Sequence, residues 1–193
     1  EFIEGREISV EFISYNGVHY PLQITDKITT EAPHFVELEH HQPSTLSTEM
    51  FTTIYDVTKT ALNALGLTNG ASHAEYKITN EGRIAIMEIG GRMGGDFIGS
   101  DLVRLSTGYD FVKGVIDVAL GEFEKPVKTL SMCSGVYFLC KETEYLKETI
   151  EKWENNPFLI EGKITDTELH NVTCSADRSG YAIYQAETKY VLT

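Results

Sequence analysis

The segment HAEYKITNEGRIAIMEIGGRMGG, from His73 to Gly95, restricts the fold of this chain more than any other stretch. Apolar and polar residues alternate on both sides of a turn, which is typical of two short strands joined as a β-hairpin. Glu75 lies in the first strand and Glu88 in the second. Like charges that face each other across a ladder are destabilising, so an acidic pair at this place calls for a compensating ligand.

The length of the turn decides whether the two glutamates share a face of the sheet. A two-residue turn, Glu81-Gly82, places Glu75 directly opposite Glu88, and we adopt this register. A four-residue loop would make them diagonal neighbours on one face, whereas a three-residue loop would send them to opposite faces. Two carboxylates at cross-strand distance suit Mg²⁺, which takes one or two protein carboxylates and fills its other positions with water and substrate phosphates.

A solvated sheet face with scattered charges would show the same periodicity, since His73 and Lys77 also fall on it. The tail that follows favours a ligand site instead. Residues 90–95 hold four glycines, and glycine lets the backbone approach a ligand closely. Arg92, which stands among them, can form a fork onto phosphate or carboxylate oxygens.

The rest of the chain predicts an α+β fold. Strands are expected over 6–14 and after the Asn16-Gly17 turn, and residues 26–46 read as a long loop. A helix should begin after the N-cap Ser47 and stop at Gly66, and two more should cover 96–106 and 107–121. Further on, the patterns predict strands over 134–140, 170–176 and 181–187 and a helix over 143–156. We expect an antiparallel sheet with helices packed on one face and a smaller C-terminal α+β element, divided near Pro126 into 1–125 and 126–193.

Composition excludes some classes of function. The chain of 193 residues has 29 acidic and 16 basic side chains and a formal net charge of −13. Nucleic acid is an improbable partner for so acidic a chain, because phosphate binding needs a basic face. No apolar run is long enough for a membrane span. The three cysteines have no metal-type spacing and are expected to be buried or half-buried free thiols in a cytoplasmic protein.

The residues from Glu1 to Gly121 resemble a known family. The stretch EFIEGREISVE, a helix, and then GASHAEYKI…IMEIGGRMGGDFIGSDLVRLSTGYDFV resembles the C-terminal half of an ATP-grasp ligase. The branch of carboxylate–amine ligases that includes L-amino-acid ligases is the most similar, and biotin carboxylase and carbamoyl-phosphate synthase are more distant. The chain opens without methionine, directly in this pattern, which is expected of a fragment whose partner lobe and N-terminal domain are absent.

The resemblance implies roles for particular residues. The backbone of Glu1, Phe2 and Ile3 would bind the adenine, and Glu7 would hold the ribose hydroxyls. Glu75 and Glu88 would carry Mg²⁺ or Mn²⁺ between the ATP phosphates, and Arg92 would neutralise the transferring phosphate. The substrate side is expected to include His34, Glu37, His73, Gly94 and Gly95. Surface histidines on a loop remain the other reading of His34 and its neighbours His40 and His41.

The implied reaction converts a small carboxylate, such as an amino acid, to an acyl phosphate with ATP, and an amine then attacks it to form an amide. One position departs from the family pattern. Many members have asparagine two residues after the second glutamate, as a further metal ligand, where this chain has Gly90. Either water replaces that ligand or one metal is held more weakly. Lacking the lysines and glycine-rich loop of the partner lobe, the chain alone is expected to show little or no turnover.

Two other interpretations remain open. The same nucleotide and metal residues would serve an ATP-grasp carboxylase or a carbamoyl-phosphate synthase-like enzyme. In a different class, the chain would be a non-catalytic acidic binding module whose Glu75 and Glu88 form a solvated face. The expected partners are ATP, small carboxylate and amine substrates, the N-terminal lobes of the same enzyme and, as a homodimer, a second copy of the chain.

Overall fold

The computed structural model describes residues 1–192, which form two compact units. The first contains Glu1–Asp26 and Gln42–Ser131, and the second contains Lys27–His41 and the chain from Met132 onward. Each unit combines strands with helices, so the predicted α+β class is confirmed. The division into a lobe over 1–125 and an extension over 126–193 stays a prediction.

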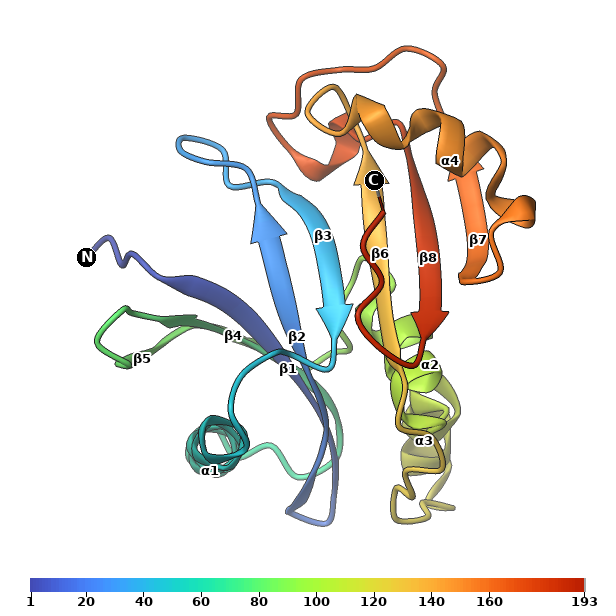
Figure 1. Ribbon diagram of the computed structural model, residues 1–193. Coiled ribbons are helices and arrows are strands. Elements are labelled where there is room, and N and C mark those ends of the chain that lie inside the picture. Colours follow the sequence, from blue (N-terminus) through green and yellow to red (C-terminus); the bar gives the residue numbers. More distant parts are fainter. Residues whose placement is uncertain (193) are drawn as a thin grey trace. The chain divides into compact units, whose positions relative to one another are not determined.

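Strands of the first unit follow one another in the order β5-β4-β1-β2 (Figure 1). Their bounds are Ile84–Gly90 for β5, Gly70–Ile78 for β4, Arg6–Tyr15 for β1 and Val18–Thr29 for β2, the last of which runs on into the second unit. The β1–β4 and β4–β5 pairs are antiparallel, as predicted. At the β1–β2 turn Asn16 and Gly17 have φ of 50° and 77°, the left-handed pair that a tight hairpin turn with the right twist needs.

Helices cover both faces of this part of the sheet, so the expectation that they pack on one face was wrong. Successive residues of a strand point to opposite faces. Phe12 packs its ring edge-on against Tyr55 of helix α1 (Thr48–Ala64), with 5.7 Å between ring centroids. Its neighbour Ile13 belongs to the cluster that contains Phe111 and Val118 of helix α3 (Phe111–Leu120).

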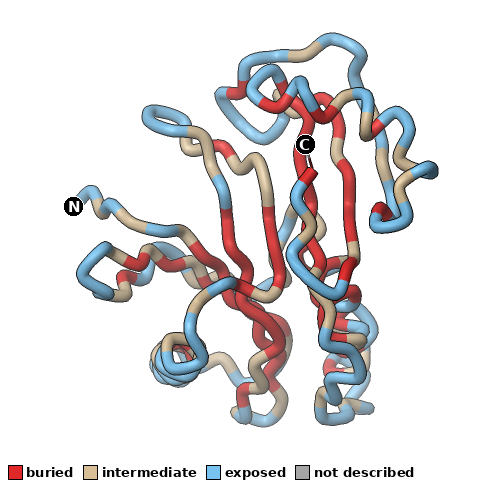
Figure 2. The backbone as a smooth tube through the Cα atoms, in the orientation of Figure 1, coloured by how far each residue is buried: buried red, intermediate tan, exposed pale blue. Residues whose placement is uncertain are grey.

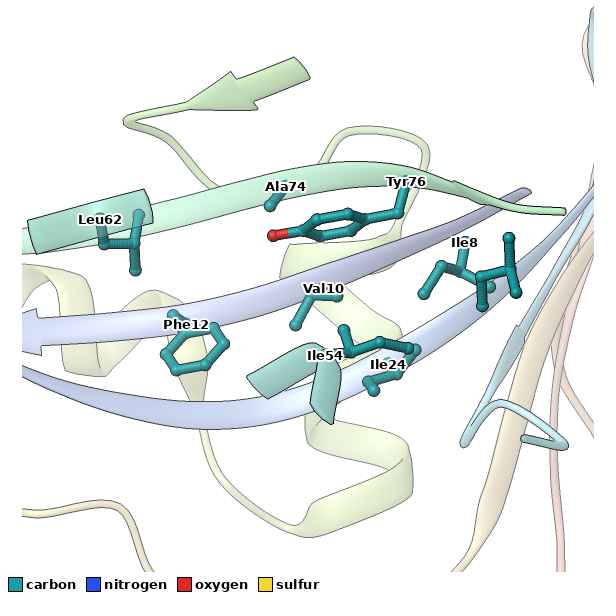
Figure 3. Close-up of a cluster of buried hydrophobic side chains, with 9 residues drawn as sticks. Ile8, Val10, Phe12, Ile24, Ile54, Leu62, Ala74 and Tyr76 are labelled. Carbon is teal, nitrogen blue, oxygen red and sulfur yellow. The ribbon is translucent and has the colours of Figure 1, made fainter. Parts of the chain in front are cut away.

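The core on the α1 side is drawn from three strands and the helix (Figure 3). Its fully buried members include Ile8, Val10 and Phe12 of β1, with Ile54 and Leu62 of α1. The opposite face is covered at one end by α3, by a π-helical turn over Ile98–Leu102 and by the short helix α2 (Val103–Thr107). Figure 2 shows that burial, drawn in red, follows the strands.

Helix α1 begins where the sequence predicts. The Ser47 side chain accepts a hydrogen bond from the Met50 backbone N–H at 3.2 Å, which satisfies a donor that the first turn leaves unpaired. We expect Ser47→Ala to lower the free energy of unfolding by about 1 kcal/mol, measured by urea denaturation. Thr60→Ala, in the exposed middle of the same helix, is the control and should change stability by less than about 0.5 kcal/mol. Equal losses in both variants would contradict the capping role.

Strands of the second unit follow the order β3-β6-β8-β7. Their bounds are Glu37–Gln42, Cys133–Leu139, Gly180–Ala186 and Leu159–Ile164, and β6–β8 and β7–β8 are antiparallel. The helix α4 (Lys147–Glu151) lies between 3-10 turns at Glu144–Leu146 and Trp153–Asn155, and another such turn covers Ser175–Asp177. Leu146 and Ile150 pack with Tyr137 and Tyr184 in the core of this unit.

Several expected elements differ from those observed. Residues 26–46 are not one long loop, because β2 continues to Thr29 and β3 occupies Glu37–Gln42. The predicted strand over 170–176 is instead irregular and ends in a 3-10 turn, whereas β7 was not predicted. The single helix expected over 143–156 is divided into three short helical pieces.

Within the described part of the chain, no helix is both long and apolar enough to cross a membrane. All three cysteines are free, as expected. Cys140 is buried and Cys133 half-buried, but Cys174 is exposed, so the expected burial holds for two of the three. Burial raises the pKa of the Cys140 thiol, which is the behaviour of an inert core cysteine.

Candidate functional site

The β4–β5 hairpin places its two glutamates opposite each other through a combination of loop length and β-bulge that the sequence does not reveal. Its loop has three residues, because the Thr79 backbone N–H donates to the Arg83 carbonyl at 3.0 Å. The two-residue turn, which would pair Asn80 with Arg83, was therefore wrong. A regular ladder from this loop would set Met87 opposite Glu75.

A β-bulge corrects the register. Ile78 pairs with Ile84 and Tyr76 with Ile86, but the register shifts between Glu75 and Tyr76, and Glu75 then pairs with Glu88. A bulge sets two residues of one strand against one of its partner, and it increases the local twist. The acidic pair thus lies on one face, although the loop has the length that would normally separate it.

One face of β1 and β4 is polar around this pair. Glu7, Ser9 and Glu11 of β1 stand directly opposite Lys77, Glu75 and His73 of β4, respectively. The Lys77 amine lies 3.3 Å from a Glu7 carboxylate oxygen, so these two form an ion pair at one end of the face. Because the other face packs on α1, this polar face is where a ligand with charged groups can bind.

A buried hydrogen-bonded chain joins three residues of the face. The Glu11 side chain is fully buried, and the His73 Nδ1–H donates to its Oε1 atom. The His73 Nε2 atom lies 3.1 Å from Oε1 of Glu75. Burial alone would lower the pKa of His73, but the hydrogen bonds and negative charges of Glu11 and Glu75 raise it to about 9. His73 is therefore an imidazolium at neutral pH and donates to both carboxylates.

The glycine-rich segment after β5 contacts Glu11, the first residue of the same hydrogen-bonded chain. The Gly94 backbone N–H donates to Oε2 of Glu11 at 2.9 Å. A Cβ atom on Gly94 would lie 2.8 Å from both Glu11 Oε1 and His73 Nδ1, closer than carbon atoms approach such groups. Glycine is required here because the backbone lies against the buried pair. No such contact is present at Gly95, where an added Cβ meets nothing within 4 Å.

Arg92 and Gly90 lie beside the acidic pair. The exposed Arg92 guanidinium donates to the Met93 carbonyl at 2.9 Å. A Cβ atom on Gly90 would lie 3.4 Å from Arg92 Cγ and 3.9 Å from Glu88 Oε1. The position expected to hold a further metal ligand is thus next to Glu88, but its residue has no side chain to contribute.

The predicted adenine hinge lines a cavity. Glu1, Phe2 and Ile3 border a space of about 330 Å³ together with the hairpin loop over 79–83. The Phe2 side chain is 69% exposed. Arg83 lies 3.6 Å from the Glu1 carboxylate across this space. The hinge residues and the hairpin that carries the acidic pair therefore belong to one region of the first unit.

The predicted substrate-side residues His34 and Glu37 belong to the second unit. His34 is exposed. Glu37 forms an ion pair with Lys27, with 3.2 Å between the Glu37 Oε1 and Lys27 Nζ atoms. His40 and His41 are not surface histidines, since each is 1% exposed in β3. The His41 ring bridges Glu39 and the Tyr184 hydroxyl at 2.7 and 3.0 Å.

The residues present fit a divalent cation that also binds phosphates. Within residues 1–192 no group of three or more His, Cys, Asp or Glu side chains is arranged to hold a metal by itself. Mg²⁺ does not need such a cage, because two carboxylates with water and phosphate oxygens complete its shell. The hydroxyl of the fully buried Ser9, opposite Glu75, has no hydrogen-bond partner in the part of the chain that the structure describes. Ser9 stands beside Glu75 in the row Ser9, Glu75, Glu88 across three strands, and an unsatisfied buried polar atom next to an acidic pair calls for an explanation such as a nearby polar ligand.

The sequence analysis missed Glu11. Its position was visible as the third polar residue in the alternation of Glu7, Ser9 and Glu11, and alternation predicts which face a residue takes. Nothing in the alternation tells which polar residue of a half-buried strand is covered. The partner of Glu11 depends on the β1–β4 register, which pairs it with His73 across strands distant in sequence.

Comparison with known proteins finds matches over much of the chain. The model of the ATP-grasp domain matches residues 1–101. Alanine–anticapsin ligase of Bacillus amyloliquefaciens is 34% identical over 189 residues, covering 91% of this chain and 39% of that protein. The same enzyme of Bacillus subtilis (strain 168) is 35% identical over 88 residues, or 46% of this chain and 18% of that protein. The chain thus spans well under half the length of these curated relatives.

Comparison with solved structures shows that the fold is similar to that of a ligase of known structure. The structure of an L-amino acid ligase from Bacillus licheniformis superposes with a TM-score of 0.79 at 21% sequence identity, covering 97% of this chain and 50% of that one. At this identity the likeness concerns the fold alone. The acidic pair of the hairpin, the glycine-rich segment and the hinge all lie within the matched residues 1–101. This chain belongs to the ATP-grasp domain family.

Proposed function

We propose that this chain is the C-terminal portion of an ATP- and Mg²⁺-dependent ligase that joins a carboxylate to an amine. The register of Glu75 with Glu88 carries the proposal, because the bulge at Met87 sets directly opposite each other the two residues that the resemblance expects to be the metal ligands. A solvated face would not need a bulge to pair like charges.

The reaction proposed has two steps. A substrate carboxylate oxygen attacks the γ-phosphorus of ATP, ADP leaves, and an acyl phosphate forms. An amine nitrogen then attacks the carbonyl carbon, inorganic phosphate leaves, the nitrogen loses a proton, and an amide remains. Phosphoryl transfer depends mainly on positioning and on charge neutralisation, so the protein needs few groups that react covalently.

Each site residue has a task in this scheme. Glu75 and Glu88 would hold Mg²⁺, which would neutralise charge on the phosphate oxygens. Arg92 donates to the transferring phosphate, the task for which a guanidinium fork is well suited. Glu7 would hold the ribose hydroxyls, and the backbone of Glu1–Ile3 would meet the adenine in the cavity of about 330 Å³.

Amino acids are the substrates that the relatives favour. The two curated proteins are named as ligases of alanine with anticapsin, and the superposed structure is an L-amino acid ligase. An amino acid as carboxylate donor is the corresponding proposal for this chain. The substrate-side predictions remain His34, Glu37, His73, Gly94 and Gly95. A carboxylase or carbamoyl-phosphate synthase-like activity is the alternative within the same family. Since the chain spans half of the L-amino acid ligase structure, we expect little turnover from it alone.

Titration calorimetry of Mg·ATP into the chain tests the proposal. We expect binding that requires Mg²⁺ and that weakens at least about tenfold, or 1.4 kcal/mol, in Glu75→Gln and in Glu88→Gln, because each variant removes one carboxylate from the cation. The control is Glu49→Gln, which removes an equal charge from the first turn of α1. Binding retained by both hairpin variants would overturn the metal assignment, and a folded wild-type chain that does not bind would contradict nucleotide binding by this portion alone.

A further inference from the structure

One buried carboxylate connects the two halves of the candidate site. The hairpin supplies Glu75 and Glu88, and the segment after β5 supplies Arg92. Glu11, on the neighbouring strand β1, contacts both halves. Its Oε1 atom accepts from His73, which reaches Glu75, and its Oε2 atom accepts from the Gly94 backbone at 2.9 Å.

The burial of Glu11 makes these contacts obligatory. Burying a carboxylate is costly unless hydrogen bonds compensate its lost hydration. Here both oxygens of Glu11 have a partner, the His73 ring for Oε1 and the Gly94 backbone N–H for Oε2. Moving either His73 or Gly94 would leave one of the two buried oxygens without its partner, so each is held in one place. Because its own atoms are engaged and covered, Glu11 acts through its neighbours.

We propose that Glu11 is the positioning residue of the site: through His73 it fixes the orientation of Glu75, and through the Gly94 backbone it fixes the segment that carries Arg92. This inference rests on the proposed function, since Glu75 and Arg92 are the groups that Glu11 positions. Ligand-binding residues lose affinity when a neighbour that orients them is removed, typically by 10–100-fold for a metal ligand.

A buried histidine elsewhere in the first unit provides a matched control. His19 of β2 is 8% exposed, and it bonds the Ser14 hydroxyl at 2.7 Å and the Asn63 side chain at 3.3 Å. His19 thus joins a strand to α1 as His73 joins two strands, but it contacts none of the proposed ligands. His19→Gln should cost stability without affecting the metal.

The experiment measures the affinity of the full chain for Mn·ATP by the electron paramagnetic resonance signal of free Mn²⁺. We expect Glu11→Gln and His73→Gln to weaken binding about tenfold or more and His19→Gln to leave it unchanged. Glu11→Gln keeps the shape of the side chain, removes its charge and replaces one of its two acceptor oxygens with an amide donor. Should that variant fail to fold, His73→Gln carries the test, because it breaks the same chain at its middle.

A double-mutant cycle separates positioning from general destabilisation. Because Glu11 acts in part through Glu75, Glu11→Gln combined with Glu75→Gln should weaken Mn·ATP binding by clearly less than the sum of the two single losses. Wild-type affinity in Glu11→Gln, additive losses in the double variant, or an equal loss in His19→Gln would each overturn the inference while leaving the proposed function intact. Wild-type affinity in Glu75→Gln would instead overturn the proposed function, and this inference with it.

Discussion

Replacing Phe12 with alanine is expected to lower the free energy of unfolding by about 3–5 kcal/mol, the range for truncating a buried phenylalanine. The Phe12 side chain has no exposed surface and packs in the cluster between β1, β4 and α1 (Figure 3). Its ring also makes the edge-on contact with Tyr55, worth about 0.5–1.5 kcal/mol beyond area burial. Urea denaturation followed by circular dichroism measures the loss.

An exposed apolar residue is the control for this prediction. Leu120, at the end of α3, is 66% exposed, so Leu120→Ala should change the free energy of unfolding by less than about 0.5 kcal/mol. A loss below 1 kcal/mol in Phe12→Ala would show that α1 does not depend on this face of β1. It would also contradict the assignment of the opposite face to the ligand.

Replacing Gly5 with alanine is expected to cost about 3 kcal/mol and to weaken Mg·ATP binding as well. Gly5 has φ of +152°, and an added Cβ would lie 2.3 Å from the Ile78 carbonyl oxygen and 2.7 Å from its carbon. Both atoms are backbone at the end of β4, so neither can rotate away. The clash would separate β1 from β4 beside the hinge cavity, and denaturation with calorimetry would measure both losses.

Gly17 is the control that separates the cost of a positive φ from the cost of a steric clash. It also has positive φ, +77°, but an added Cβ there meets nothing within 4 Å. Gly17→Ala should therefore cost only the left-handed conformation, about 1–2 kcal/mol, with nucleotide affinity unchanged. If Gly5→Ala cost no more than Gly17→Ala, the contact with Ile78 would not explain the glycine in EFIEG.

Local patterns in the sequence predicted much of the first unit because they coincide with its packing. The alternation of β1, the Asn16-Gly17 turn and the Ser47 cap are each determined by neighbours in sequence. The second unit was predicted less well. Strand β3 (Glu37–Gln42) has the sequence ELEHHQ, in which buried histidines look like polar loop residues. Their burial depends on partners such as Tyr184, far along the chain.

The candidate site shows the same division. A resemblance to a family located Glu75, Glu88 and Arg92, and the structure places them in one region. The register argument offered for the acidic pair was wrong in its loop, since three residues turn the chain where two were expected. Its conclusion held because a bulge cancels the error, and a bulge leaves no periodic signal by which sequence could reveal it.

That bulge has a consequence for how the site is encoded. The side chain of Met87 is 48% exposed, so its chemical identity should matter little. Its presence as one extra residue in β5, however, decides which residue faces Glu75. A scan of substitutions would pass over position 87 as neutral. Part of the information for this site is thus carried by the count of residues between two glutamates, and only insertions and deletions would reveal it.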